Sequence, residues 1–115
     1  GIAGLRDRKT DEVLTAKARA DELRAKVAVP AVYERAERAA AVAEENFEEG
    51  EYVEAYRVAD QAVERYNEAY RQALELRQQA QAALNRAEER GQRSREQINE
   101  YEEDLREAEE ELGNR

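Results

Sequence analysis

The chain has 115 residues, of which 41% are charged, and its formal net charge is -9 with a sequence pI near 4.7. This length suits a single helical domain over residues 1–115, and the acidic balance opposes binding to the phosphate backbone of nucleic acids. Histidine and cysteine are both absent, which removes the commonest general base, the commonest transition-metal ligand and thiolate chemistry. We therefore expect a non-enzymatic protein with no cofactor and no metal site. No apolar stretch is long enough to span a membrane.

Alanine is the most frequent apolar residue, with 22 copies, and glutamate, arginine, leucine and glutamine are also abundant. These residues lose little side-chain freedom in a helix, whereas β-branched and aromatic runs bounded by turn residues are missing. The composition and the helical spacing of apolar residues predict an all-α protein with a thin core.

The first helix is predicted over residues 10–28. Thr10 can cap it, and Asp11 and Glu12 would place negative charge at the favourable end of the helix dipole. Residues 1–9 are interpreted as an irregular lead-in. Proline disfavours helical geometry in the residue before it and suits a first helical turn, so Val29 is the expected joint.

The second helix is predicted over residues 30–49, beginning at Pro30 and ending at Gly50, which can adopt a left-handed conformation. A tight hairpin then leads to a third helix over residues 51–112. In that helix, apolar and aromatic residues alternate spacings of four and three, which is a heptad seam. The pattern occupies positions 52, 56, 59, 63, 66, 70, 73, 77, 80, 84, 87, 91, 94, 98, 101, 105, 108 and 112, and departs from apolar character only at Arg77, Gly91 and Ser94.

Two interpretations compete at residues 91–94. Ser94 followed by Gln97 is a capping-box signature that could begin a separate helix, but a loop would usually change the phase of the seam. Because the phase is kept through Gly91, one continuous helix is favoured. The predicted fold is an antiparallel three-helix bundle with a long third helix that extends as a coiled-coil-like arm.

Nine residues are candidates for partner binding. Tyrosines gather at the start of the third helix and on the second, where they could fill a thin core or line a groove between helices; the core interpretation is favoured. The seam beyond residue 84 would have no partner within the chain and would pair with a second copy or another protein. The candidates are Tyr33, Tyr52, Tyr56, Tyr66, Tyr70, Ile98, Tyr101, Leu105 and Leu112.

The segment from Phe47 to Ala59, with its Gly50-Glu51-Tyr52 turn, resembles the helical hairpin of tetratricopeptide-like proteins, although no 34-residue repeat is evident. The wider pattern, with Pro30 opening a helix and an alanine- and tyrosine-rich helix after the turn, is similar to a small domain of unknown function in bacterial envelope lipoproteins. That resemblance implies a periplasmic scaffold that accompanies peptidoglycan-binding modules. The lipidated cysteine of such lipoproteins is absent from this chain.

These observations predict a structural or protein-interaction module, and the resemblance to envelope lipoproteins implies the cell envelope as its location. Its partner would be another protein or a second copy, bound through the C-terminal helix, with no nucleic acid and no direct membrane span. The alternative prediction is a small-ligand or peptide binder that uses a tyrosine-lined cleft between helices.

Overall fold

The computed structural model describes residues 1–113 except for the side chain of Ile2, and this part of the chain is all-helical, as the sequence predicts. Four helices follow one another, α1 (Ile2–Glu22), α2 (Ala25–Ala28), α3 (Pro30–Glu48) and α4 (Tyr52–Gly113). No strand occurs among the described residues. The chain divides into an N-terminal unit, Gly1–Arg77, and a C-terminal unit, Gln78–Arg115.

Helix α1 begins at Ile2, so the prediction that it starts at Thr10 after an irregular lead-in is wrong. Contacts from the first two turns to other helices explain the difference. The Arg6 guanidinium lies 5.4 Å from the centre of the Phe47 ring, and Lys9 Nζ lies 2.9 Å from a carboxylate oxygen of Asp60 on α4. These tertiary contacts stabilise a helix start that has no side-chain cap.

The predicted first helix is also broken before residue 28. Helix α1 ends at Glu22, Arg24 adopts a left-handed conformation with φ of 52°, and α2 follows as a separate short helix. The reversal buries Ala25 completely beside Ala20 in the core. Burial of this small residue offsets the cost of a left-handed non-glycine residue.

The joint before α3 and the turn after it agree with the sequence. Val29 ends α2 and precedes α3, whose first turn contains Pro30. Gly50 has φ of +78°, its N–H donates to the Phe47 carbonyl, and the Glu51 N–H donates to the Asn46 carbonyl. This pair of hydrogen bonds satisfies carbonyls at the end of α3 and reverses the chain into α4.

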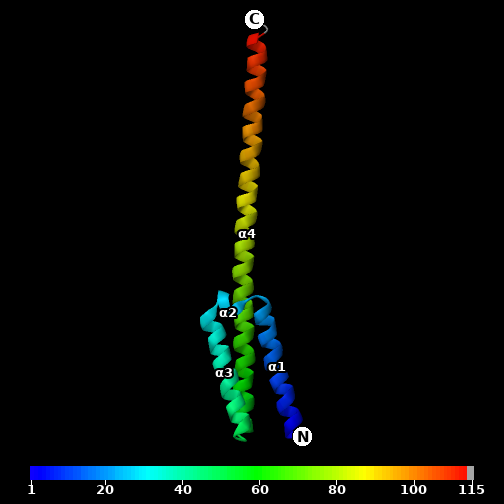
Figure 1. The fold of residues 1–115 in the computed structure, drawn as a ribbon, viewed down its shortest axis with the longest axis vertical. Helices are drawn as coiled ribbons and strands as arrows, with labels where there is room; N and C mark the ends of the chain where they lie inside the picture. Colours follow the sequence, from blue (N-terminus) through cyan, green and yellow to red (C-terminus); the bar gives the residue numbers. More distant parts are fainter. Residues whose placement is uncertain (114–115) are drawn as a thin grey trace. The chain divides into compact units, whose positions relative to one another are not determined.

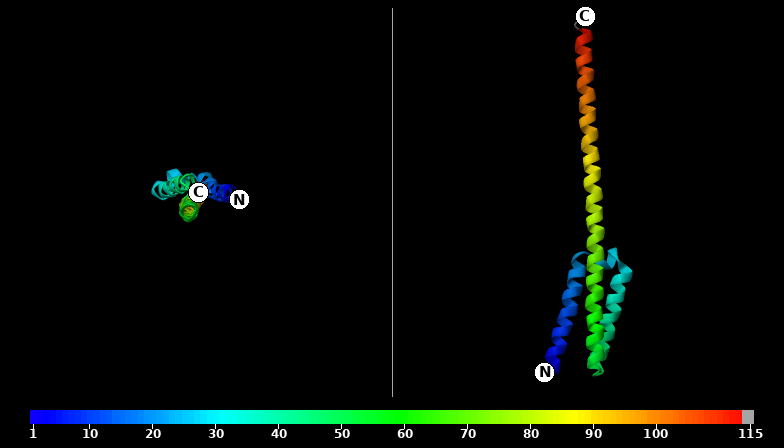
Figure 2. Two further views of the ribbon diagram at one scale, coloured as in Figure 1. Left: turned by 90° about the horizontal axis from the view of Figure 1, so that it is seen from below. Right: turned by 180° about the vertical axis from the view of Figure 1, so that it is seen from behind.

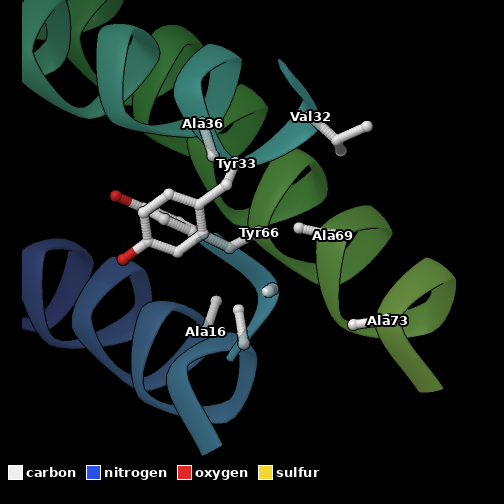
Figure 3. Packing of buried hydrophobic residues seen from close by; sticks show 9 residues of the cluster. Ala16, Val32, Tyr33, Ala36, Tyr66, Ala69 and Ala73 are labelled. Atoms are coloured by element: carbon white, nitrogen blue, oxygen red, sulfur yellow. The ribbon is translucent and has the colours of Figure 1, made fainter. Parts of the chain in front are cut away.

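In the N-terminal unit, α1, α3 and the first part of α4 lie side by side (Figure 1 and Figure 2). Small residues from all of them meet in one core around two tyrosine rings (Figure 3). This core consists of Ala16 and Ala20 of α1, Ala25 of α2, Val32, Tyr33 and Ala36 of α3, and Tyr66, Ala69 and Ala73 of α4. A second cluster of Ala43, Val58 and Ala59 adjoins Val13 and Ala39.

Helix α4 runs through Gly91 and Ser94 without interruption, as the unbroken phase of the seam predicts. Within the N-terminal unit, however, the predicted seam is only half of the buried face. Alanines 55, 62 and 69 are fully buried, whereas the seam residues one position later, Tyr56, Val63 and Tyr70, are half-buried. The core therefore uses a wider apolar stripe than a two-position heptad seam.

Candidate functional site

The central feature of the N-terminal unit is a pair of tyrosine rings. Tyr33 and Tyr66 are 3% and 2% exposed, and their ring centres lie 5.5 Å apart in an edge-to-face arrangement at 72° (Figure 3). Edge-to-face packing places the positive edge of one ring against the negative face of the other. Neither ring is available to a ligand, so both tyrosines serve the core.

Burial also changes the acidity of this pair. Loss of hydration raises the pKa of the Tyr66 hydroxyl to about 12, with smaller contributions from Glu37 and Asp21. Burial raises the pKa of Tyr33 as well, and its hydroxyl donates a 2.6 Å hydrogen bond to Asp21 Oδ1. Both groups are therefore held neutral, which suits core residues and not general acids or bases near neutral pH.

A second aromatic group surrounds Phe47 near the turn between α3 and α4. Its ring centre lies 5.7 Å from that of Tyr56 and 6.5 Å from that of Tyr52. Arg6 contacts Phe47, and Lys9 Nζ lies 5.3 Å from the centre of the Tyr56 ring. The Tyr56 hydroxyl oxygen is buried and has no hydrogen-bond partner. Cations from α1 thus cover rings from α3 and α4.

Tyr70 lies apart from both groups. It borders the main core, and the guanidinium of Arg19 lies 4.5 Å from its ring centre. The five tyrosines are consequently distributed over three places and do not face one cleft. Arg6, Lys9 and Arg19 contact aromatic rings, and no feature of the sequence marks these three residues, because such contacts leave no periodic pattern.

An apolar groove of about 550 Å³ lies between α1 and α3. It contains Val13 and Leu14 of α1, Ala43 and Phe47 of α3, and Ala59 of α4, and its rim carries both signs of charge. None of the five candidate tyrosines lines it. The groove is therefore a separate feature from the tyrosine groups.

The C-terminal unit contains no buried residue between positions 78 and 113. The side chains of the seam remain in contact with water along this part of α4. Leu84, Ile98, Tyr101, Leu105 and Leu112 are 58%, 53%, 62%, 61% and 67% exposed. These five residues, with Ala80, Ala87, Gly91, Ser94 and Ala108 of the same heptad pattern, form what we call the C-terminal seam.

Within residues 1–113, no group of three or more histidine, cysteine or acidic residues is arranged to hold a metal ion. No helix in this range is long and apolar enough to cross a membrane. The chain matches no protein-family model, no curated protein and no solved structure. The resemblance to tetratricopeptide-like hairpins and to envelope lipoproteins therefore stays a prediction.

Proposed function

We propose that the chain is a non-enzymatic structural and protein-interaction module. In this proposal the N-terminal unit is an antiparallel three-helix bundle, and the C-terminal seam of α4 is a coiled-coil-like arm that pairs with a second copy of the chain. The observation that carries the proposal is the set of five large apolar seam residues, each more than half exposed, on the part of α4 from residue 78 to residue 113, where no side chain is buried.

The width of the apolar stripe supports pairing with one helix. In the seam row at positions 56, 63, 70, 77 and 84, the residue before each position is also apolar, namely Ala55, Ala62, Ala69, Leu76 and Ala83. Beyond residue 84 the same position holds Arg90, Gln97, Asp104 and Glu111. A wide stripe is typical of a helix in a globular core, whereas a narrow stripe with charged flanks is typical of a coiled-coil seam.

A single unpaired helix with an exposed apolar stripe is only marginally stable in water. Most helical stability in proteins comes from packing of the apolar face, not from helix propensity alone. Burial of one leucine side chain contributes about 1.5–3 kcal/mol, so pairing several of them is a substantial driving force. Exposed charges on the remaining faces keep the helix hydrated outside the seam.

The alternative function, a small-ligand or peptide binder with a tyrosine-lined cleft, has less support. Tyr33 and Tyr66 are buried in the core, and the groove between α1 and α3 lacks all five tyrosines. If a ligand binds the N-terminal unit, this groove with Phe47 and Leu14 is the expected place. A role as a periplasmic scaffold rests only on the resemblance to envelope lipoproteins.

Sedimentation equilibrium of the full chain tests the proposal. We expect concentration-dependent association that is lost when Ile98→Glu and Leu105→Glu are combined, because two charges then occupy the seam. The matched control combines Asn85→Glu and Asn99→Glu, which adds the same charge at exposed positions outside the seam. The proposal fails if the unmodified chain remains monomeric, or if both double variants weaken association equally.

A further inference from the structure

Nothing within the chain itself requires a glycine at seam position 91. Gly91 lies within α4, and it is not a glycine with positive φ. A Cβ atom at this place would meet only the end of the flexible Arg95 side chain, at 3.4 Å. Glycine is among the poorest helix formers, so a residue with a side chain would stabilise the isolated helix. The space at Gly91 is therefore expected to serve something outside the chain.

The two rows of the C-terminal seam differ in size. One row holds large residues, except for a single glycine, and the other holds small residues, except for a single tyrosine. The large row is Leu84, Gly91, Ile98, Leu105 and Leu112, and the small row is Ala80, Ala87, Ser94, Tyr101 and Ala108. The two exceptions, Gly91 and Tyr101, are complementary in size.

We propose, on the basis of the self-association proposed above, that two copies pair in antiparallel orientation with the ring of Tyr101 over Gly91 of the second copy. In an antiparallel coiled coil, the first row of one helix faces the second row of its partner. With Gly91 opposite Tyr101, every other layer also joins a large residue to a small one. The remaining layers are Leu84 with Ala108, Ile98 with Ser94, Leu105 with Ala87, and Leu112 with Ala80.

Neighbouring antiparallel alignments lose this complementarity. A shift of one heptad in one direction places Gly91 opposite Ser94 and Leu84 opposite Tyr101. A shift in the other direction places Gly91 opposite Ala108 and Ile98 opposite Tyr101. Each shift therefore produces one layer with a void and one that is overfilled, and both defects destabilise a packed interface.

A parallel pair is also poorly packed. Equivalent residues would then face one another, so Ala87, Gly91 and Ser94 would form three successive layers of small residues. Tyr101 would face the second copy's Tyr101. The alternation of large and small residues that fills an interface would be lost.

The charges on the helix favour the same orientation. Residues 84–95 contain four arginines and two glutamates, whereas residues 96–112 contain nine acidic residues and one arginine. In the proposed alignment, residues 84–95 of one copy face residues 97–108 of the other, which contain five acidic residues and one arginine. A parallel pair would place both acidic ends together, and like charges at a seam are unfavourable.

Distances between spin labels test the orientation on the full chain. The protein has no cysteine, so Glu110→Cys and Glu96→Cys each introduce one labelling site at an exposed position outside the seam. At 1.5 Å per residue, the antiparallel alignment separates the two labels at position 110 by about 42 Å along the helix axis. The labels at position 96 lie level with each other, about 20 Å apart across the pair.

The outcomes separate this proposal from the one on which it rests. A long distance at position 110 with a short one at position 96 supports the antiparallel pair. Short distances at both positions, in a chain that associates, overturn the antiparallel pair and leave self-association intact. A chain that is monomeric in sedimentation overturns both.

A size exchange tests the layer of Gly91 and Tyr101. Gly91→Leu is expected to weaken association about tenfold or more, because the new side chain collides with the second copy's Tyr101. Adding Tyr101→Ala to Gly91→Leu exchanges the large and small partners and is expected to restore the affinity to within about threefold. In a parallel pair, Gly91→Leu would fill a void, and stronger association of that variant would refute the proposed layer.

Discussion

The hydroxyl of Tyr33, in the first turn of α3, donates a 2.6 Å hydrogen bond to Asp21 Oδ1 in the last turn of α1. The ring of Tyr33 is buried, whereas Asp21 lies at the surface, so the bond joins the core to its edge. The hydroxyl of Tyr56 has the opposite status, because it is buried without a partner. The two hydroxyl groups are therefore expected to contribute to stability with opposite signs.

Replacing these hydroxyls one at a time tests that difference. Tyr33→Phe is expected to lower the free energy of unfolding by about 1 kcal/mol, because a hydrogen bond to a carboxylate is lost. Tyr56→Phe removes an unsatisfied buried group and is expected to leave stability unchanged or to raise it by up to about 1 kcal/mol. Urea unfolding at one protein concentration measures both variants. Equal losses of free energy of unfolding in Tyr33→Phe and Tyr56→Phe would contradict the proposed difference between the two hydroxyl groups.

The glycines predict a second pair of opposite effects. Gly50 has φ of +78°, and Gly4 lies inside α1 with no atom near its missing Cβ. Gly50→Ala is expected to destabilise the protein by about 1 kcal/mol, since alanine disfavours the left-handed conformation. Gly4→Ala is expected to stabilise α1 by about 0.5–1 kcal/mol. Thermal unfolding followed by circular dichroism compares the two variants. A gain in stability for Gly50→Ala would contradict the left-handed conformation at this turn.

Arg24 gives the converse case, a non-glycine residue in the left-handed region with φ of 52°. Arg24→Gly is expected to raise the free energy of unfolding by about 1 kcal/mol, because the steric cost of Cβ is removed at a helix end. Arg24→Ala keeps the Cβ atom and separates this effect from loss of the charge. If Arg24→Ala stabilises the protein as much as Arg24→Gly, the backbone explanation is wrong.

Strong local signals explain which parts of the fold were predictable. Pro30 restricts Val29 and suits a first helical turn, and Gly50 alone among nearby residues adopts positive φ without cost. The continuity of α4 followed from a phase that Gly91 does not disturb. Each of these features depends on the residue itself and its immediate neighbours.

The features that sequence analysis missed depend on distant contacts. The start of α1 at Ile2 depends on Arg6 and Lys9 meeting residues of α3 and α4, and no cap marks it. The break at Arg24 has no glycine or asparagine to indicate it. One of the two rows of the buried face of α4 was placed one position too late, at Tyr56, Val63 and Tyr70, whereas the other row was correct. Alanine is common on both sides of the seam, and its hydrophobicity does not distinguish a core position from a half-buried one.

Lys9 of α1 reaches α4, with Nζ 2.9 Å from carboxylate oxygens of both Glu12 and Asp60 and 5.3 Å from the centre of the Tyr56 ring. Lys9→Met keeps most of the apolar stem and removes the charge, so we expect a loss of about 0.5–1 kcal/mol. The exposed Lys26 provides a matched control, Lys26→Met, with an expected change near zero. The difference in free energy of unfolding between Lys9→Met and Lys26→Met should become smaller in 1 M salt, because salt screens the charges. A difference that becomes larger would refute an electrostatic origin.

The raised pKa values of Tyr33, Tyr66 and Lys9 predict a loss of stability at alkaline pH. Hydrogen bonds to Asp60 and Glu12 raise the pKa of Lys9, whereas burial is the main cause for the tyrosines. In all three cases the folded state holds its proton more tightly than the unfolded state. The stabilisation is therefore complete below the unfolded pKa, about 10 for tyrosine, and is lost as pH rises through the folded value, about 12 for Tyr66.

Unfolding by urea between pH 9 and pH 12 measures this loss, and the variant that isolates Tyr66 is Tyr66→Phe. The ring and its packing against Tyr33 remain, but the ionisable hydroxyl is gone. The decline of the free energy of unfolding between pH 10 and pH 12 should be smaller in Tyr66→Phe than in the unmodified chain, by on the order of 1 kcal/mol. Tyr52→Phe, at a residue that is 40% exposed, controls for removal of a tyrosine hydroxyl as such. If the free energy of unfolding of both variants declines with pH as steeply as that of the unmodified chain, ionisation of the buried Tyr66 hydroxyl is not the cause of the alkaline loss of stability.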